Sequence, residues 1–335
     1  SAACGCAMAR RSRKRLKTRE PRLRGRTQYH AFVRPARTGA RAAMVFAVHL
    51  SDGLLHDGWL AGGWAVAALL VTASAWGMGE DEVPKVGVLT AAFFVASLLH
   101  VPAGGGSAHF LLNGLVGVVL GRRAGVAVAV GLFLQSLLIE HGGRVVLGVN
   151  VAVCGLPAML AGAAFRPLRT SALLHRPPVR FVAVVAAVLL WEVTATVAAQ
   201  WAWGRTFGDS ELSPDPAGWW VAHPVVLAAL LLAAAAAAWA ERRLEADPDF
   251  ALGLLLGAAT AYATVGLNCA ALVFGGLPGV PVAAGVILLM HLPVIAVEAV
   301  GVGFVVAFLA KAKPEWVGGH EPSGSGNTSS NGTSH

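Results

Sequence analysis

The chain has 335 residues, of which 56% are hydrophobic and only 13% are charged, and its formal net charge is +8. Soluble globular proteins carry about a quarter charged residues, so this composition excludes a soluble globular protein, and it excludes intrinsic disorder over most of the chain. Four cysteines are too few to staple a secreted disulfide scaffold of this length, and the apolar content argues against a soluble nucleic-acid-binding protein.

The positive charge is confined to the N-terminal segment. Residues 1–43 contain 13 Lys and Arg and a single acidic residue, whereas the remaining 292 residues contain 13 basic and 17 acidic residues. The segment has no apolar run like that of a signal peptide, and the chain begins with Ser. We therefore expect residues 1–47 to be a basic extension that is not part of the mature protein. A basic targeting or surface-binding arm is the alternative.

Nine hydrophobic segments follow, and most reach or approach the ~20 residues that cross a bilayer core. They cover roughly residues 59–78, 86–102, 108–121, 124–140, 145–165, 181–201, 219–240, 250–275 and 280–310. Segment 108–121 is short, and we expect it to enter the membrane from a re-entrant loop. Pro293 is expected to kink the long last segment. Residues 317–335 are rich in Gly, Ser and Asn and are expected to be disordered, which leaves 48–316 as the transmembrane domain.

The loops between these segments predict an orientation. If residue 58 lies outside and the chain alternates, the inner loops receive eleven Lys and Arg and the outer loops only Arg144 and Arg205. Cytoplasmic loops carry such an excess of basic residues. The sequence therefore predicts an all-α, polytopic helical bundle in the plasma membrane. It has about nine spans, with the N-terminus outside and the C-terminus inside.

Two histidines fall on the predicted outer side near the membrane surface. His49 precedes the first span, and His109 follows the glycine run Gly104–Gly106, which permits a sharp turn and a close backbone approach. Imidazole is a common ligand for nickel, cobalt and zinc. A satisfied core histidine is the alternative for each one alone, but two on one face make a metal site a reasonable hypothesis.

Other polar residues are weaker candidates. His100 and His141 also lie toward the outer side, either as groups that surround the ligands or as ordinary interfacial residues. Glu192 and Glu298 fall inside spans, where a carboxylate is costly and usually faces a partner or a cavity. Glu298 lies two helical turns after His291, so the pair shares one face, as a buried structural pair or as a transport relay. No ATPase motif is present, so the chain alone is not expected to hydrolyse ATP.

Three blocks of the sequence resemble the CbiM/NikM family of membrane-embedded substrate-binding subunits, which belong to energy-coupling-factor ABC transporters for cobalt and nickel. The first is His49-Leu50-Ser51-Asp52-Gly53. The second runs from Pro102 to Asn150 and includes Gly105-Gly106-Ser107-Ala108-His109, Gln135, Gly142-Gly143 and Leu147-Gly148-Val149-Asn150. The third runs from His291-Leu292-Pro293 through Glu298 to Phe308-Leu309 and Lys313-Pro314-Glu315. Their order and spacing cover about half of the chain.

The resemblance implies that one divalent metal is captured from outside by four nitrogens in a flat arrangement. These nitrogens are a terminal amine, the next amide, the imidazole of that second residue and a second imidazole after the glycine loop. The two imidazoles correspond to His49 and His109. Ser107, His100, His141 and Asn150 are then candidates for groups that surround the ligands. Four nitrogens suit square-planar Ni²⁺ and accommodate cobalt, and a metallated amide must lose its proton, so binding is expected to weaken as pH falls.

This sequence departs from the family pattern in two respects. His49 is not the second residue, and only a start at Val48, which a GTG initiation codon would read as Met, places a terminal amine beside it. Val48 is therefore the candidate for the amine ligand. In addition, about two more spans than the family pattern suggests lie within 181–275, and a fused accessory subunit is one interpretation of them.

The resemblance implies a transporter subunit rather than an enzyme, with no cofactor and with Co²⁺ or Ni²⁺ as the transported ligand. The expected partners are a transmembrane coupling subunit, cytoplasmic ATP-binding subunits, membrane lipid and in addition a small accessory membrane subunit; nucleic acid is not among them. The main alternative is a secondary ion-coupled transporter that uses Glu192 and Glu298 as relay acids. A membrane-bound metal hydrolase is disfavoured because the chain has no HExxH motif. The ligands do not discriminate cobalt from nickel.

Overall fold

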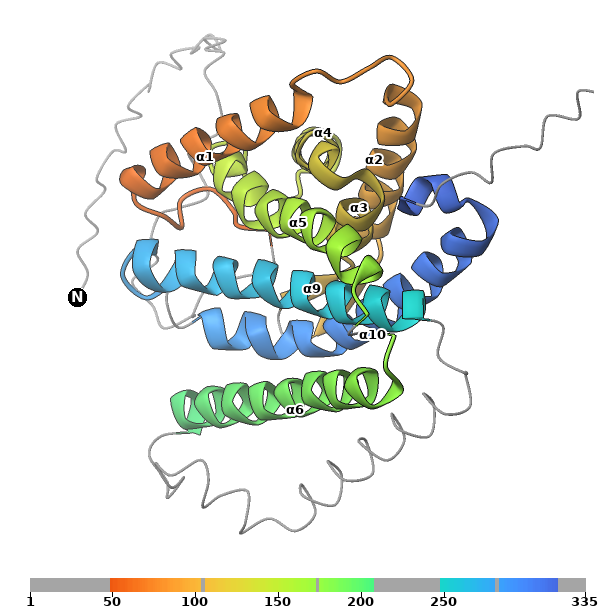
Figure 1. Cartoon of the computed structure of the whole chain (residues 1–335). Coiled ribbons are helices and arrows are strands. Elements are labelled where there is room, and N and C mark those ends of the chain that lie inside the picture. Colours follow the sequence, from red (N-terminus) through yellow and green to blue (C-terminus); the bar gives the residue numbers. More distant parts are fainter. Residues whose placement is uncertain (1–48, 104–105, 173–174, 208–247, 281–282, 319–335) are drawn as a thin grey trace, which may run out of the picture. The chain divides into compact units, whose positions relative to one another are not determined.

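The computed structural model describes residues 49–103, 106–172, 175–207, 248–280 and 283–318. These residues form helices and one two-stranded hairpin (Figure 1). The helices are α1 (Asp57–Ala75), α2 (Val83–Ser97), α3 (Asn113–Leu120), the 3-10 helix η1 (Gly121–Arg123), α4 (Ala124–Leu138), α5 (Leu147–Thr170), α6 (Pro177–Phe207), α9 (Pro248–Gly275), α10 (Ala283–Ala312) and the 3-10 helix η3 (Pro314–Val317). The hairpin consists of β1 (His100–Ala103) and β2 (Gly106–His109).

Each hydrophobic segment expected from the sequence contains one helix, except 219–240, which lies outside the described residues together with the extension 1–47. Within the described part, six stretches are long and apolar enough to cross a membrane, and α2 is shorter. One of these stretches, Asn113–Leu138, comprises α3, η1 and α4, and Gly121 with a φ of +57° ends α3 within it. The described residues therefore support a polytopic helical bundle and do not confirm a count of nine spans. The tail expected at residues 317–335 overlaps η3, because Val317 is the last residue of that helix and is buried. Residues 319–335 lie outside the described residues.

The segment expected at 86–102 is helical only as far as Ser97, which corrects the predicted boundary. Residues 100–109 instead form the antiparallel hairpin, in which His100 pairs with His109 and Ala103 with Gly106. The reason is local. Pro102 lacks a backbone N–H and keeps the preceding residue out of the helical region, and the adjacent glycines permit the tight return of the chain. Hydrophobic content alone did not reveal this break.

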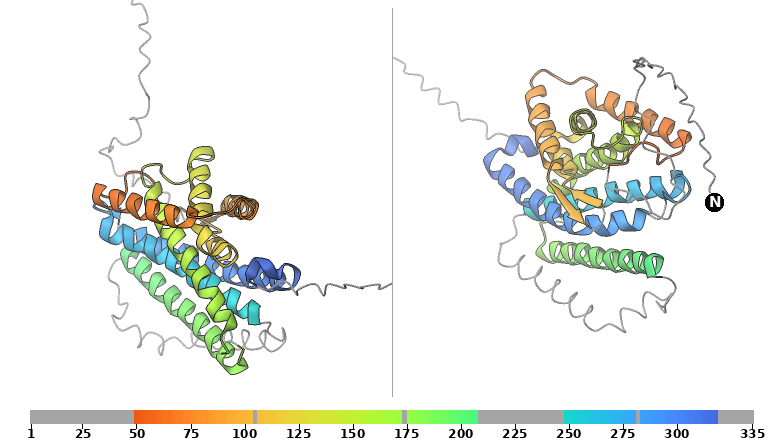
Figure 2. Two further views of the ribbon diagram at one scale, coloured as in Figure 1. Left: turned by 45° about the horizontal axis from the view of Figure 1, so that its top comes forward. Right: turned by 180° about the vertical axis from the view of Figure 1, so that it is seen from behind.

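The helices pack through glycines that let backbones approach closely. A Cβ atom on Gly63 of α1 would lie 2.8 Å from the Cα atom of Val149 in α5, and one on Gly148 of α5 would lie 2.7 Å from the Cα atom of Trp64. A Cβ atom on Gly253 of α9 would lie 3.0 Å from the Cα atom of Gly303 in α10. As Figures 1 and 2 show, α9 and α10 run side by side and α6 lies along them. Trp191 of α6 donates its indole N–H to the Leu292 carbonyl, 2.7 Å away, beside Pro293.

Basic residues gather at one end of the bundle. Arg123 donates to the carbonyls of Ser74, Trp76 and Gly77 at the end of α1 and forms an ion pair with Glu82 just before α2. The hydrogen bond from Arg123 lowers the pKa of Glu82 to about 2, so this carboxylate stays charged. Arg169, in the last turn of α5, forms an ion pair with Asp249, in the first turn of α9. We call this the basic end.

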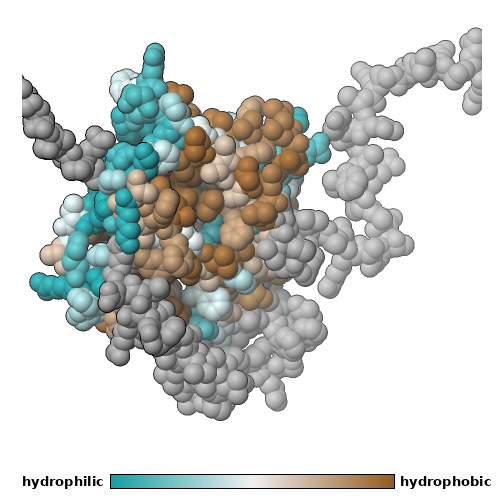
Figure 3. Space-filling view, turned by 90° about the vertical axis from the view of Figure 1, so that its right-hand side faces the viewer, coloured by the Kyte–Doolittle hydropathy of each residue, from teal (hydrophilic) through white to brown (hydrophobic). Residues whose placement is uncertain are grey.

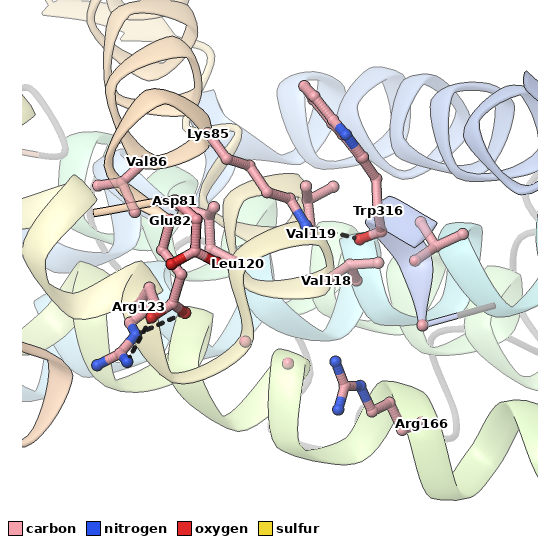
Figure 4. Close-up of a pocket in the computed structure, with 14 residues that line it drawn as sticks. Asp81, Glu82, Lys85, Val86, Val118, Val119, Leu120, Arg123, Arg166 and Trp316 are labelled. Atoms are coloured by element: carbon pink, nitrogen blue, oxygen red, sulfur yellow. Dashed lines mark hydrogen bonds and ion pairs between the residues drawn. The ribbon is translucent and has the colours of Figure 1, made fainter. Parts of the chain in front are cut away.

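The basic end also contains a pocket of about 270 Å³ between α2, α3, α5 and η3. In Figure 4 the Lys85 ammonium reaches the Trp316 carbonyl, the Arg123–Glu82 pair closes one side and Arg166 lies on another. None of the histidines or carboxylates singled out from the sequence lines this pocket.

Large apolar side chains cover much of the outer surface of the described helices. Leu69 of α1, Phe274 of α9 and Phe308 of α10 are among the most exposed. On the face shown in Figure 3, the hydrophobic groups spread across the middle and the hydrophilic groups gather toward one side. A soluble monomer rarely exposes so large an apolar area. This surface is therefore suited to lipid.

Packing at the α1–α5 crossing generates a matched test. Gly63→Ala places a methyl group against the backbone of Val149, and we predict that it lowers the free energy of unfolding by about 1–3 kcal/mol. Gly62→Ala is the control, because nothing lies within 4 Å of its added Cβ atom and alanine favours a helix over glycine by about 1 kcal/mol. Thermal unfolding in detergent measures both variants. Equal melting temperatures for the two would contradict the predicted close crossing.

Candidate metal centre

Three histidines from distant parts of the sequence meet at the end of the bundle opposite the basic end. His49 precedes α1, His109 ends β2, and His141 lies in the loop between α4 and α5. Their ring centroids are 4.6 Å apart for His49 and His109, 4.9 Å for His109 and His141, and 5.2 Å for His49 and His141. Each offers one nitrogen, and these three atoms lie within 4.8 Å of one another. Among the described residues, this is the group whose spacing could hold a metal ion.

The backbone next to His49 is held by the side chain of Asn150 in the first turn of α5. The amide oxygen of Asn150 accepts from the Leu50 N–H at 2.9 Å, and its amide nitrogen donates to the Leu50 carbonyl at 3.0 Å. The same carbonyl accepts from the Gly143 N–H at 3.0 Å. Both polar groups of Leu50 are thus bonded within a buried environment, where losing a partner is costly. Asn150, predicted as a group around the ligands, fixes the segment that carries His49.

Asp52 ties the same segment to the start of α5. Its carboxylate accepts from the N–H groups of Arg144, Val145 and Val146 at 2.9–3.1 Å. These groups precede the first turn of α5, where backbone donors lack helical partners and negative charge is favourable. The chain can follow this path only because Gly142 has a φ of +77° and because Gly143 has no side chain to overlap Asp52. Steric constraints therefore explain why two glycines follow His141.

His109 is buried and its ring orientation is fixed locally. Its Nδ1 lies 3.1 Å from the Phe110 carbonyl, an arrangement in which Nδ1–H donates and Nε2 carries the lone pair that a metal needs. The following turn is held by Glu298 of α10, whose carboxylate accepts from the N–H groups of Leu111 and Leu112. Leu112 has a φ of 46°, which is a left-handed conformation. The hydrogen bonds to Glu298 help to hold the Leu112 backbone in it. Glu298 thus supports His109 from another helix.

The remaining sequence candidates divide into those near the cluster and those away from it. The His291 ring lies 6.5 Å from the His109 ring, and its Nδ1 donates to the Ile287 carbonyl at 2.7 Å. Glu298 bonds backbone groups, and no ion pair with His291 is found among the described residues. Glu192 lies on α6, which contributes none of the three histidines. His100 and Ser107 lie in the hairpin strands, but their side chains are outside the description, as is the whole of Val48.

The sequence predicted His49 and His109 as a pair, and the structure brings them together. It also brings the His141 ring to 4.9 Å from His109 and 5.2 Å from His49, slightly farther than the 4.6 Å between those two, whereas the sequence suggested only a surrounding position. The signal for this was present, since His141-Gly142-Gly143 directly follows the hydrophobic segment predicted at 124–140. The roles of Asp52 and Glu298 carried no such signal, because their partners are backbone groups far away in the sequence.

The cluster offers three imidazoles and no thiolate or carboxylate among its members. Imidazole suits borderline first-row ions such as Co²⁺, Ni²⁺, Cu²⁺ and Zn²⁺, whereas Mg²⁺ and Ca²⁺ prefer oxygen. The arrangement is therefore chemically fitted to bind a divalent transition metal.

Residues 49–241 match the family model described as "cobalt uptake substrate-specific transmembrane region". A putative metal transport protein of Haemophilus influenzae is 39% identical over 119 residues, which are 36% of this chain and 58% of that protein. A putative fused nickel transport protein, NikMN, of Archaeoglobus fulgidus is 38% identical over 108 residues, or 31% of this chain and 36% of that protein. A truncated transition metal transporter of known crystal structure has a TM-score of 0.45 and 18% identity, with coverage of 79% of this chain and 99% of that one. The aligned part thus spans little more than half of the bacterial relative.

The Asn150 contacts generate a testable prediction. Asn150→Ala removes both hydrogen bonds to Leu50, and loss of a group that positions a ligand typically weakens metal binding about 10–100-fold. Isothermal titration of the purified protein with Ni²⁺ and Co²⁺ measures the change. Asn113→Ala is the control, because this buried amide bonds the Cys154 carbonyl and Thr264 instead. Wild-type affinity in Asn150→Ala, with a normal thermal unfolding curve, would contradict the role assigned to Asn150.

Proposed function

We propose that this chain, which belongs to the family of cobalt uptake substrate-specific transmembrane regions, captures Co²⁺ or Ni²⁺ as the substrate-binding subunit of an energy-coupling-factor ABC transporter. The observation that carries the proposal is the convergence of His49 and His109, both buried and with ring centroids 4.6 Å apart, at one end of a multi-pass helical bundle. The metal is the substrate, and the chain holds it without doing chemistry on it.

Capture is proposed to occur at the outer face of the plasma membrane. The basic end contains Arg123, Arg166 and Arg169 and lies opposite the histidines, and basic loops favour the cytoplasmic side. In this orientation residues 48–316 form the membrane domain, with nine spans, the N-terminus outside and the C-terminus inside. Residues 219–240 would supply the span that the described residues lack. The histidines then lie at the outer end of the bundle, the side from which the metal arrives.

The two imidazoles are proposed as the side-chain ligands. Additional nitrogens would come from the backbone, from the His49 amide and, if Val48 is the first residue, from its amine. Co²⁺ and Ni²⁺ both accept such a set. The family description refers to cobalt and the archaeal relative's name to nickel, and we propose both ions as substrates.

The alternative of a secondary transporter would require mobile carboxylates. The Glu298 carboxylate accepts from two backbone N–H groups, which supports a fixed role beside His109 rather than a relay. Glu192 lies on a different helix, α6. These contacts favour metal capture over ion-coupled transport through the two acids.

Uptake driven by ATP is proposed to depend on a transmembrane coupling subunit and cytoplasmic ATP-binding subunits, because the sequence contains no nucleotide-binding motif. Helix α1 offers a contact face for a partner helix. Gly63 is used against α5, whereas Ala61, Gly62, Ala65 and Ala68 are exposed. Such small residues allow close approach of another helix within the membrane.

The first prediction concerns the ligand. His109→Ala is expected to abolish high-affinity binding of Ni²⁺ and Co²⁺ while the protein still inserts and folds, because it removes one of the two central imidazoles. Isothermal titration measures binding, and His175→Ala is the control, since this histidine is exposed and lies at the basic end. Unchanged affinity in His109→Ala would overturn the proposed site.

The second prediction concerns energy coupling. Liposomes that contain this chain alone are expected to show no ATP-dependent accumulation of metal, and addition of the coupling and ATP-binding subunits is expected to restore it. Radioactive Ni²⁺ or Co²⁺ uptake with ATP inside and outside the liposomes measures the difference. Full ATP-dependent uptake without partners would contradict the proposal, and uptake driven by an ion gradient and lost in Glu298→Gln would favour the secondary transporter.

A further inference from the structure

We propose that the pocket at the basic end binds the phosphate group of an anionic phospholipid, with the Lys85 ammonium and the Arg166 guanidinium as its anchors. This inference goes beyond metal capture and uses none of the histidines. It takes from the proposed function only the orientation, in which the basic end faces the cytoplasm.

Arg166 is the cation that carries the inference. Two other arginines of the basic end are paired, because Arg123 forms an ion pair with Glu82. Arg169 forms one with Asp249. The Arg166 guanidinium makes no hydrogen bond or ion pair within the described part of the chain, and it lines the pocket of about 270 Å³. A guanidinium carries five N–H donors in a planar fork that matches phosphate oxygens, so Arg166 is available to a ligand.

Lys85 supplies a second positive charge from the opposite side of the pocket. Its ammonium donates to the Trp316 carbonyl at 3.1 Å and lies 5.4 Å from the centre of the Trp316 ring. An ammonium has three donors, so this carbonyl leaves two for a ligand. As Figure 4 shows, Lys85 reaches in from α2 and Arg166 from α5. Two like charges that line one pocket repel each other, and an anion between them replaces repulsion by attraction.

The acidic residues of the basic end do not cancel these charges. Both carboxylate oxygens of Glu82 accept from Arg123, at 2.9 and 2.6 Å. Glu315, which does not line the pocket, lies 3.7 Å from the Lys313 ammonium. Asp81 is the other carboxylate of the lining, and it lies on the side of Glu82. Three basic and two acidic side chains therefore line the pocket, which is an excess of one positive charge.

The remaining lining favours a lipid over a soluble anion. Val86, Val118 and Leu120 line the same pocket, so apolar surface adjoins the two cations. The volume is far above the roughly 10–15 Å³ that holds one water, which leaves room for a headgroup. Tryptophan is enriched where a membrane meets water, and Trp316 stands at this pocket. Basic pockets between membrane helices on the cytoplasmic side suit anionic headgroups.

The site has a consequence for lipid selectivity. Phosphatidylglycerol carries one negative charge on its phosphate, and its glycerol is neutral. Phosphatidylcholine carries the same phosphate beside a quaternary ammonium, which the excess positive charge of the pocket repels. We therefore expect the protein to prefer phosphatidylglycerol.

The test measures lipid binding to the purified, delipidated full chain in detergent. Native mass spectrometry, with phosphatidylglycerol, phosphatidylcholine or inorganic phosphate as the probe, counts the bound molecules and gives their affinity. The wild type is expected to bind one phosphatidylglycerol most tightly. Arg166→Gln and Lys85→Gln are each expected to weaken this binding roughly tenfold or more, because a charge-assisted hydrogen bond is lost.

Arg122→Gln is the matched control. Arg122 is exposed at the same end and does not line the pocket, and physiological salt screens charges that do not touch the lipid. This variant is expected to bind phosphatidylglycerol as the wild type does. Thermal unfolding without lipid verifies folding, and Arg166→Gln removes no hydrogen bond of the described structure.

Three results would overturn the inference. Equal weakening in Arg166→Gln and Arg122→Gln would mean that the basic end as a whole attracts the lipid. Equal affinity of the wild type for the two lipids would exclude the predicted selectivity. Inorganic phosphate bound as tightly as phosphatidylglycerol would assign the pocket to a soluble anion. Failure here is distinct from failure of metal capture or of the orientation. Arg166→Gln is expected to keep the wild-type affinity for Ni²⁺, and binding in detergent does not depend on which side the basic end faces.

Discussion

The hydrogen bonds between Leu50 and Asn150 are the contacts on which the metal centre depends. His49 lies on a segment with no secondary structure of its own before α1, so its position must come from elsewhere. Asn150 bonds both polar groups of Leu50, Gly143 bonds the same carbonyl, and Asp52 accepts from three N–H groups before α5. These hydrogen bonds anchor the irregular segment to the start of α5. His49 is thereby held in the fixed geometry that a metal ligand needs.

The polar groups of the bundle are divided between its two ends. At the histidine end they fix backbone segments, with Asp52 and Glu298 both accepting from N–H groups. At the basic end they form ion pairs between helices, as in Arg123–Glu82 and Arg169–Asp249. Between the ends, the surface is apolar and the crossings depend on glycines. This division is what a membrane imposes, because polar groups inside the bilayer must find partners within the protein.

Much of this organisation follows from the sequence. Hydrophobic segment lengths located eight described helices, and the spacing around the glycine run led to His49 and His109. The hairpin at 100–109 did not follow, because an apolar run that includes Pro102 does not reveal that α2 already ends at Ser97. The count of nine spans stays a prediction. The closeness of His141 and the support from Glu298 depend on which loops meet in space. A single sequence carries no signal for contacts between side chains and distant backbone groups.

The most direct measurement is the position of the ion itself. A structure of the full chain crystallised with Ni²⁺ or Co²⁺, with anomalous scattering recorded at the absorption edge of the metal, would locate it without assumption. The account predicts one strong peak between His49 and His109, at about 2.1 Å from a nitrogen of each, at the end of the bundle opposite Arg123 and Glu82. A peak bound only at the pocket of the basic end, or at carboxylates on α6 and α10, would contradict it.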